Sequence, residues 1–136
     1  MAVKKTLGLY VHIPFCRSKC LYCDFCSFPR PREELVEAYV KALERDLLQK
    51  SALCRDYEVD TVYFGGGTPT SLPGMLLPRL LDRITSHYNV GANAEITAEC
   101  NPTTESLSLF REMRRARSFR FAFYIPQPLT IPPFCA

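Results

Sequence analysis

The sequence predicts an α/β fold built on a parallel sheet, and two observations indicate it. Short apolar, β-prone segments at residues 8–13 (GLYVHI), 59–64 (VDTVYF) and 95–100 (EITAEC) alternate with longer segments of helical periodicity. Each short segment also ends abruptly at a proline, a glycine run or an Asn-Pro turn. Right-handed crossovers then bring the loop after every strand to the same carboxyl-terminal edge of the sheet, where α/β folds bind ligands.

The first strand, residues 8–13, is mostly apolar, so we expect it to be buried on both faces. A helix is expected over residues 32–52, where Pro31 suits a helix start. Lys41, Glu44 and Arg45 are expected to face away from the core. The expected apolar stripe of this helix consists of Leu35, Ala38, Tyr39, Ala42, Leu43 and Leu47.

A second helix is expected between residues 73 and 88, after the strand that ends at the glycine run 65–67. The third strand precedes a third helix that carries Leu109, Phe110, Met113 and Ala116. Residues 120–125 are a candidate fourth strand. The apolar side of the second helix is expected to consist of Leu77, Leu80, Leu81 and Ile84.

The composition changes near residue 117. Residues 117–136 hold four prolines, four phenylalanines and no acidic residue. Four prolines so close together are incompatible with a helix or a central strand. We therefore expect residues 1–116 to be one structural unit and residues 117–136 to be a divergent tail, in which a fourth strand extends at most to residue 125.

The 136 residues are 47% hydrophobic and 23% charged, which is typical of one globular domain and argues against disorder. No apolar run approaches the ~20 residues of a membrane-spanning helix, and the first ten residues lack the features of a secretory signal. The net charge of +3 is too small to imply a nucleic-acid partner. The expected location is the cytoplasm.

Seven cysteines are present, and four of them lie within eleven residues, at Cys16, Cys20, Cys23 and Cys26. In a reducing compartment such a cluster is typical of metal ligands or redox groups. The Cys16-x3-Cys20-x2-Cys23 spacing favours a four-iron cluster held by three thiolates with one iron left open. Two alternatives remain: a zinc site completed by Cys26, or a cluster held by Cys20, Cys23 and Cys26.

Two further features fall at the same predicted sheet edge. The glycines of the 65–68 run (GGGT) allow close approach of a ligand and are expected to leave backbone N–H groups free to bind it. Glu99, at the end of the third strand, is placed to pair with an amine or a ribose hydroxyl. A plain turn and an exposed strand-end acid are the alternative interpretations.

Three ordered motifs resemble a known family. They are residues 10–25 (YVHIPFCRSKCLYCDF), 64–69 (FGGGTP) and 95–102 (EITAECNP). Together they resemble radical S-adenosylmethionine (SAM) proteins, and more narrowly the family of oxygen-independent coproporphyrinogen III oxidase and its heme-chaperone relative. The resemblance covers about residues 7–116. It implies the N-terminal part of a partial (β/α)6 TIM-like barrel.

The resemblance also implies cofactors and roles. Cys16, Cys20 and Cys23 would hold a [4Fe–4S] cluster whose fourth iron takes SAM. In the family, the reduced cluster cleaves SAM and the 5′-deoxyadenosyl radical abstracts hydrogen from substrate, which requires an electron donor as a partner. The residues that fall where the family contacts SAM are Tyr10, Tyr22, Gly66, Gly67, Thr68 and Glu99.

Phe25 favours the heme-chaperone branch, because the oxidase has a further cysteine at this position. The expected ligand is then heme, or else a porphyrin or porphyrinogen, and turnover of coproporphyrinogen is not expected. A complete eight-unit barrel needs ~250 residues, so we expect a truncated or frameshifted product. A non-catalytic zinc-binding module and an inactive fragment are the alternatives.

Overall fold

A computed structural model describes residues 5–101, 107–116 and 119–123 of the chain. The main strands are β1 (Lys5–Ile13), β4 (Tyr57–Gly66), β5 (Val90–Cys100) and β6 (Phe119–Phe123). They form one parallel sheet in the order β1-β4-β5-β6. The connecting helices are α1 (Glu33–Ser51), α2 (Leu76–His87) and α3 (Leu107–Ala116). The predicted α/β class and parallel sheet are therefore confirmed.

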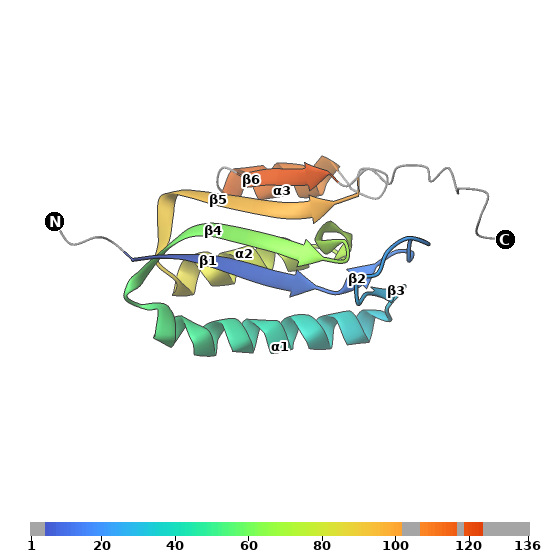
Figure 1. The fold of residues 1–136 in the computed structure, drawn as a ribbon, viewed down its shortest axis with the longest axis horizontal. Helices are drawn as coiled ribbons and strands as arrows, with labels where there is room; N and C mark the ends of the chain where they lie inside the picture. Colours follow the sequence, from blue (N-terminus) through green and yellow to red (C-terminus); the bar gives the residue numbers. More distant parts are fainter. Residues whose placement is uncertain (1–4, 102–106, 117–118, 124–136) are drawn as a thin grey trace.

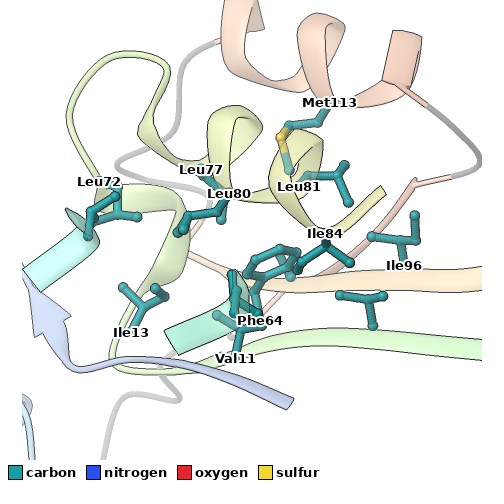
Figure 2. Close-up of a cluster of buried hydrophobic side chains, with 14 of the residues drawn as sticks. Val11, Ile13, Phe64, Leu72, Leu77, Leu80, Leu81, Ile84, Ile96 and Met113 are labelled. Atoms are coloured by element: carbon teal, nitrogen blue, oxygen red, sulfur yellow. The ribbon is translucent and has the colours of Figure 1, made fainter. Parts of the chain in front are cut away.

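The helices pack against one face of the sheet, because each right-handed crossover joins neighbouring strands in the same direction. Figure 1 shows α2 and α3 behind the strands, with α1 running along the β1 side. One hydrophobic core joins residues of β1, β4, β5 and all three helices. Figure 2 shows Phe64 of β4 beside Ile84 of α2 in this core. All four apolar residues predicted for the second helix are buried.

The expectation that the first strand is buried on both faces is wrong. Val11 and Ile13 are buried, but Tyr10 is 61% exposed and His12 is also exposed. The cause is the sequential strand order, which places the helices on one side and leaves the other side of the sheet uncovered within the described residues. We call this uncovered side the open face.

The apolar stripe predicted for α1 is also partly wrong. Leu35 is 50% exposed, and the buried side chains are Val36, Val40 and Leu47. The spacing of 36, 40, 43 and 47 follows the helical period of 3.6, so the buried stripe is centred one residue further along than predicted.

Glu44 of α1 does not face away from the protein. Its side chain is 16% exposed and its Oε1 lies 2.8 Å from Arg79 Nε and 3.6 Å from Arg83 Nε, both on α2. Glu44, which the sequence predicts on a solvated face, therefore links α1 to α2.

Short elements shape the carboxyl edge of the sheet. β2 (Phe15–Cys16) pairs in parallel with β3 (Phe28–Pro29), and the 3-10 turn η2 (Pro69–Ser71) follows β4. A second 3-10 turn, η1 (Ala52–Cys54), ends α1. β6 falls in the region of the predicted fourth strand, while residues 124 and 125 lie outside the described residues. The boundary after residue 116 stays a prediction.

No helix in the described part of the chain has both the length and the apolar character required to cross a membrane.

Candidate functional site

The loops after β1 and β4 contact each other at the carboxyl edge of the sheet. The Gly67 N–H donates to the carbonyl oxygen of Ile13 at 2.8 Å, and the Thr68 N–H donates to that of Phe15 at 2.7 Å. The Thr68 hydroxyl also lies 3.8 Å from Cys16 Sγ, within range of a weak hydrogen bond to sulfur. The glycine run and the first cysteine of the motif are therefore fixed against each other.

Two glycines of the run are required by the geometry. Gly66 has φ +117°, a conformation that other residues rarely adopt. A Cβ on Gly67 would collide with the carbonyl oxygen of Phe15 and lie 2.8 Å from Cys16 Sγ. These glycines let the two loops approach each other closely.

The expectation that the glycine run leaves its N–H groups free is wrong for Gly66, Gly67 and Thr68. The Gly66 N–H donates to Glu99 Oε2 at 3.1 Å, and the other two donate to the carbonyl oxygens of Ile13 and Phe15. The sequence could not reveal these acceptors, because they come from distant strands that the fold places beside the run.

Glu99, at the end of β5, has both carboxylate oxygens bonded to β4. Its Oε1 accepts a hydrogen bond of 2.9 Å from the hydroxyl of Tyr63, and its Oε2 accepts from Gly66. Tyr63 was not predicted as a site residue. Its place two residues before the glycine run, alternating with buried Val62 and Phe64, is the signal that could have indicated it.

Tyr10 joins this group from β1. Its ring stacks on that of Tyr63 with centroids 6.1 Å apart and planes inclined by 14°, and its hydroxyl lies 3.2 Å from His12 Nδ1. The open face thus brings together the predicted residues Tyr10, Gly66 and Glu99, with Tyr63 between them.

Both phenols on the open face have a raised pKa. Partial burial raises the pKa of Tyr63, and the hydrogen bond to Glu99 and its charge add to the effect. Although the Tyr10 ring is mostly exposed, partial desolvation and then the Glu99 charge raise the pKa of its hydroxyl. Both hydroxyls therefore keep their protons at neutral pH, and Tyr63 is a donor to the carboxylate.

The cysteine segment forms a loop closed at its base. The Phe28 N–H donates to the carbonyl oxygen of Pro14 at 2.7 Å, and the Arg30 N–H donates to the carbonyl oxygen of Cys16 at 2.8 Å. These two hydrogen bonds join β2 to β3. Further out, a turn is closed by a 3.0 Å hydrogen bond from the Cys23 N–H to the Cys20 carbonyl oxygen. The predicted contact residue Tyr22 lies in this turn and is 38% exposed.

The structure fixes Cys16 but does not gather the three predicted thiols. All three are free and partly buried, whereas Cys26 is exposed. Within residues 5–101, 107–116 and 119–123, no three Cys, His, Asp or Glu side chains lie close enough to hold one metal ion. The predicted convergence of Cys20 and Cys23 with Cys16 on one metal group therefore stays a prediction.

The donor set nevertheless fits an iron–sulfur cluster. Three free thiols on one short loop supply the ligand type that such clusters use. The hydroxyl of Ser27, inside the same loop, is buried without a hydrogen-bond partner. An unpaired buried hydroxyl is costly, so the loop that carries these thiols holds one polar group that still lacks an acceptor.

A groove of about 620 Å³ lies beside Cys16. It runs between β2, the start of α1 and the segment that follows η2, and Cys16, Arg17, Arg30 and Ser71 are among the residues that line it. Cys16, the first cysteine of the motif, therefore borders this groove together with Arg17 and Arg30.

The sequence matches the Radical SAM superfamily over residues 10–126. The chain belongs to this superfamily. It is 42% identical over 110 residues to the heme chaperone HemW of Escherichia coli, covering 81% of this chain and 29% of that protein. It is 31% identical over 111 residues to the oxygen-independent coproporphyrinogen III oxidase of Escherichia coli, covering 82% of this chain and 24% of that enzyme.

A solved structure of coproporphyrinogen III oxidase (HemN) from Escherichia coli, described as a radical SAM enzyme, superposes with a TM-score of 0.83. The sequences are 29% identical, and the match covers 90% of this chain but 28% of the other. The predicted membership of the radical SAM superfamily and the predicted partial-barrel fold are confirmed. The chain spans less than a third of the length of these relatives.

Proposed function

We propose that this chain supplies the cluster- and SAM-binding part of a radical SAM protein of porphyrin and heme metabolism. One observation carries the proposal: the glycine run is bonded on one side to the cysteine loop and on the other side to Glu99. The three motifs of the resemblance therefore meet at one sheet edge, as a single cofactor site requires.

Cys16, Cys20 and Cys23 are the proposed ligands of a [4Fe–4S] cluster. When bound, the cluster supplies the single electron that cleaves a carbon–sulfur bond of SAM, and an electron donor must replenish it. Cys16 is already held by β2 and by the glycine run, so it is the fixed point onto which the Cys20–Cys23 turn closes.

The remaining predicted residues bind and orient SAM. Glu99 accepts a hydrogen bond from its amine or from a ribose hydroxyl. Gly66 and Gly67 are proposed to act through the close packing of the glycine run on β1 and the cysteine loop, rather than through free N–H groups. Tyr10 on the open face, Thr68 beside Cys16 and Tyr22 in the Cys20–Cys23 turn are proposed as further contacts.

The heme-chaperone branch is the more specific proposal, with heme as the ligand and the cytoplasm as the location. Phe25, 69% exposed on the cysteine loop, occupies the position of the oxidase's additional cysteine. The higher identity to the chaperone (42%) than to the oxidase (31%) supports the same choice. Residues 1–116 are proposed to be the N-terminal portion of the radical SAM core.

Anaerobic reconstitution with iron and sulfide tests the cluster. We expect about four irons and four sulfides per chain, with the brown colour of a cluster. Cys20→Ser should abolish uptake, whereas the matched variant Cys26→Ser should retain it. A colourless protein with one zinc ion and four thiolate ligands would contradict the proposal, as would a loss caused by Cys26→Ser alone.

Heme titration of the reconstituted chain separates the two branches. The chaperone proposal predicts stoichiometric heme binding and no conversion of coproporphyrinogen when SAM and a reductant are supplied. Conversion of coproporphyrinogen without heme binding would favour the oxidase instead.

A further inference from the structure

The contacts of Glu99 suggest a role for a residue that the sequence motifs leave out. Tyr63 and Gly66 lie on the same strand and bind different oxygens of this carboxylate, at 2.9 Å and 3.1 Å. A glutamate side chain that is free to rotate loses conformational entropy when a ligand fixes it. Here the carboxylate is already fixed before any ligand arrives.

The sheet register explains why Tyr63 reaches Glu99. Tyr63 pairs with Thr97 of β5, and Glu99 lies two residues further along, so both side chains lie on the open face. On the other side Tyr63 pairs with Tyr10, whose ring stacks against it. The strand pairing and the stacked ring together hold the phenol in place.

Gly65 makes room for this arrangement. A Cβ at this position would lie 2.9 Å from Tyr63 Cε1 and 3.1 Å from the Tyr10 hydroxyl oxygen. The first glycine of the run therefore supports the two rings, while the second and third support the loop contacts. Each of the three glycines has a separate steric reason.

We propose that Tyr63 is a positioning residue that orients Glu99 toward SAM, an inference that rests on the proposed function. A carboxylate oxygen accepts about two hydrogen bonds. Tyr63 and Gly66 use one on each oxygen, which leaves acceptor capacity on both for a ligand amine or hydroxyl. Hydrogen bonds to a charged carboxylate are stronger than neutral ones, so the phenol holds the acid firmly.

Tyr63→Phe removes the hydroxyl and keeps the stacked ring. In the anaerobically reconstituted chain, we expect the dissociation constant for SAM, measured by equilibrium dialysis, to rise about tenfold. Iron content and the visible spectrum should be unchanged. Tyr57→Phe, at the opposite end of β4, is the matched control and should leave SAM affinity unaltered.

A double-mutant cycle distinguishes positioning from a general structural effect. If Tyr63 acts through Glu99, Tyr63→Phe should have no further effect on SAM affinity in a Glu99→Gln chain. An unchanged dissociation constant in Tyr63→Phe, or an equal loss in both backgrounds, would overturn the proposal.

A pH titration of Tyr63 needs no bound cluster, so it tests the positioning role of Tyr63 separately from the proposed SAM-binding function. Burial is the main cause of the raised pKa of Tyr63, and the hydrogen bond to Glu99 and its charge add to it. With ¹³C-labelled tyrosine, Glu99→Gln should therefore lower this pKa toward its ordinary value of 10.0, because the added charge is removed. If the pKa falls but the wild-type chain binds no SAM, the hydrogen bond stands and the proposed function fails. If the pKa does not change, the positioning role fails by itself.

Discussion

Tyr63 and Phe64 are neighbours on β4 and face opposite environments. Phe64 is fully buried under the helices, whereas Tyr63 is 36% exposed on the open face and bonded to Glu99. The same alternation separates Val11 from Tyr10 on β1. One face of the sheet therefore serves stability and the other carries polar groups suited to a ligand.

The division follows from topology rather than from composition. Sequential parallel strands with right-handed crossovers send each helix to the same side. The covered side must be apolar, because burying an unpaired polar group is costly. Residues on the open side are free to be tyrosine, histidine or glutamate, so the site can change without disturbing the core.

Phe64→Ala should have the largest effect on stability. The side chain lies at the centre of the core, and its loss should lower the free energy of unfolding by about 3–5 kcal/mol. Urea denaturation measures this change. Tyr63→Phe is the control on the opposite face and should cost about 1 kcal/mol or less. Equal losses for the two variants would contradict the division between faces.

Gly67→Ala should have the next largest effect. The added Cβ would press on the Phe15 carbonyl oxygen and on Cys16 Sγ, so we expect a loss of about 1–3 kcal/mol, typical of overpacking, together with impaired cluster uptake. Iron content and urea denaturation are the measurements. Gly74→Ala adds a Cβ into open space at φ +58°, so backbone strain should reduce stability while cluster uptake persists.

Alkaline pH should weaken the core through Tyr88. This side chain is 8% exposed, its hydroxyl donates to Leu47, and burial raises its pKa above 10.0. The folded chain thus keeps the proton to higher pH than the unfolded chain, so the stabilisation is complete below pH 10.0 and is lost as pH rises through the folded pKa. In Tyr88→Phe, the free energy of unfolding measured by urea denaturation should fall less steeply as pH rises above 10.0. An unchanged dependence on pH would assign the loss of stability to other groups.

The smallest effect is expected between helices. Glu44→Gln removes the charge that Arg79 and Arg83 share. Because both arginines are substantially exposed, we expect a loss of about 0.5–1 kcal/mol that diminishes in high salt. Glu37→Gln, which breaks the exposed pair with Lys41, should change stability less. A larger loss for Glu37→Gln would contradict the structural role given to Glu44.

Much of the fold could be predicted because strand and helix periods are local properties. The three strand segments, the apolar side of α2 and the common sheet edge all followed from spacing. The one-sided burial of β1 did not, because an apolar segment does not reveal which side the helices will cover. The expected apolar stripe of α1 includes Ala38 and Ala42, which are exposed, and omits Val36 and Val40, which are buried.

The candidate site also has a part that the sequence predicts and a part that it does not. The motif residues were visible in the sequence, but the partners of Glu99 and of the glycine run depend on strand register, which tertiary packing sets. The contact between Tyr63 and Glu99 depends on this register, so the sequence motifs alone do not include Tyr63. The convergence of Cys20 and Cys23 with Cys16 stays a prediction, because the described residues do not bring three candidate metal ligands together.

The central claim is that three thiols hold an iron–sulfur cluster with one iron available to SAM, and electron paramagnetic resonance of the reduced, reconstituted chain tests it most directly. Addition of SAM should alter the cluster signal, and methionine should then be released. A cluster signal that is identical with and without SAM, with no methionine formed, would contradict the account.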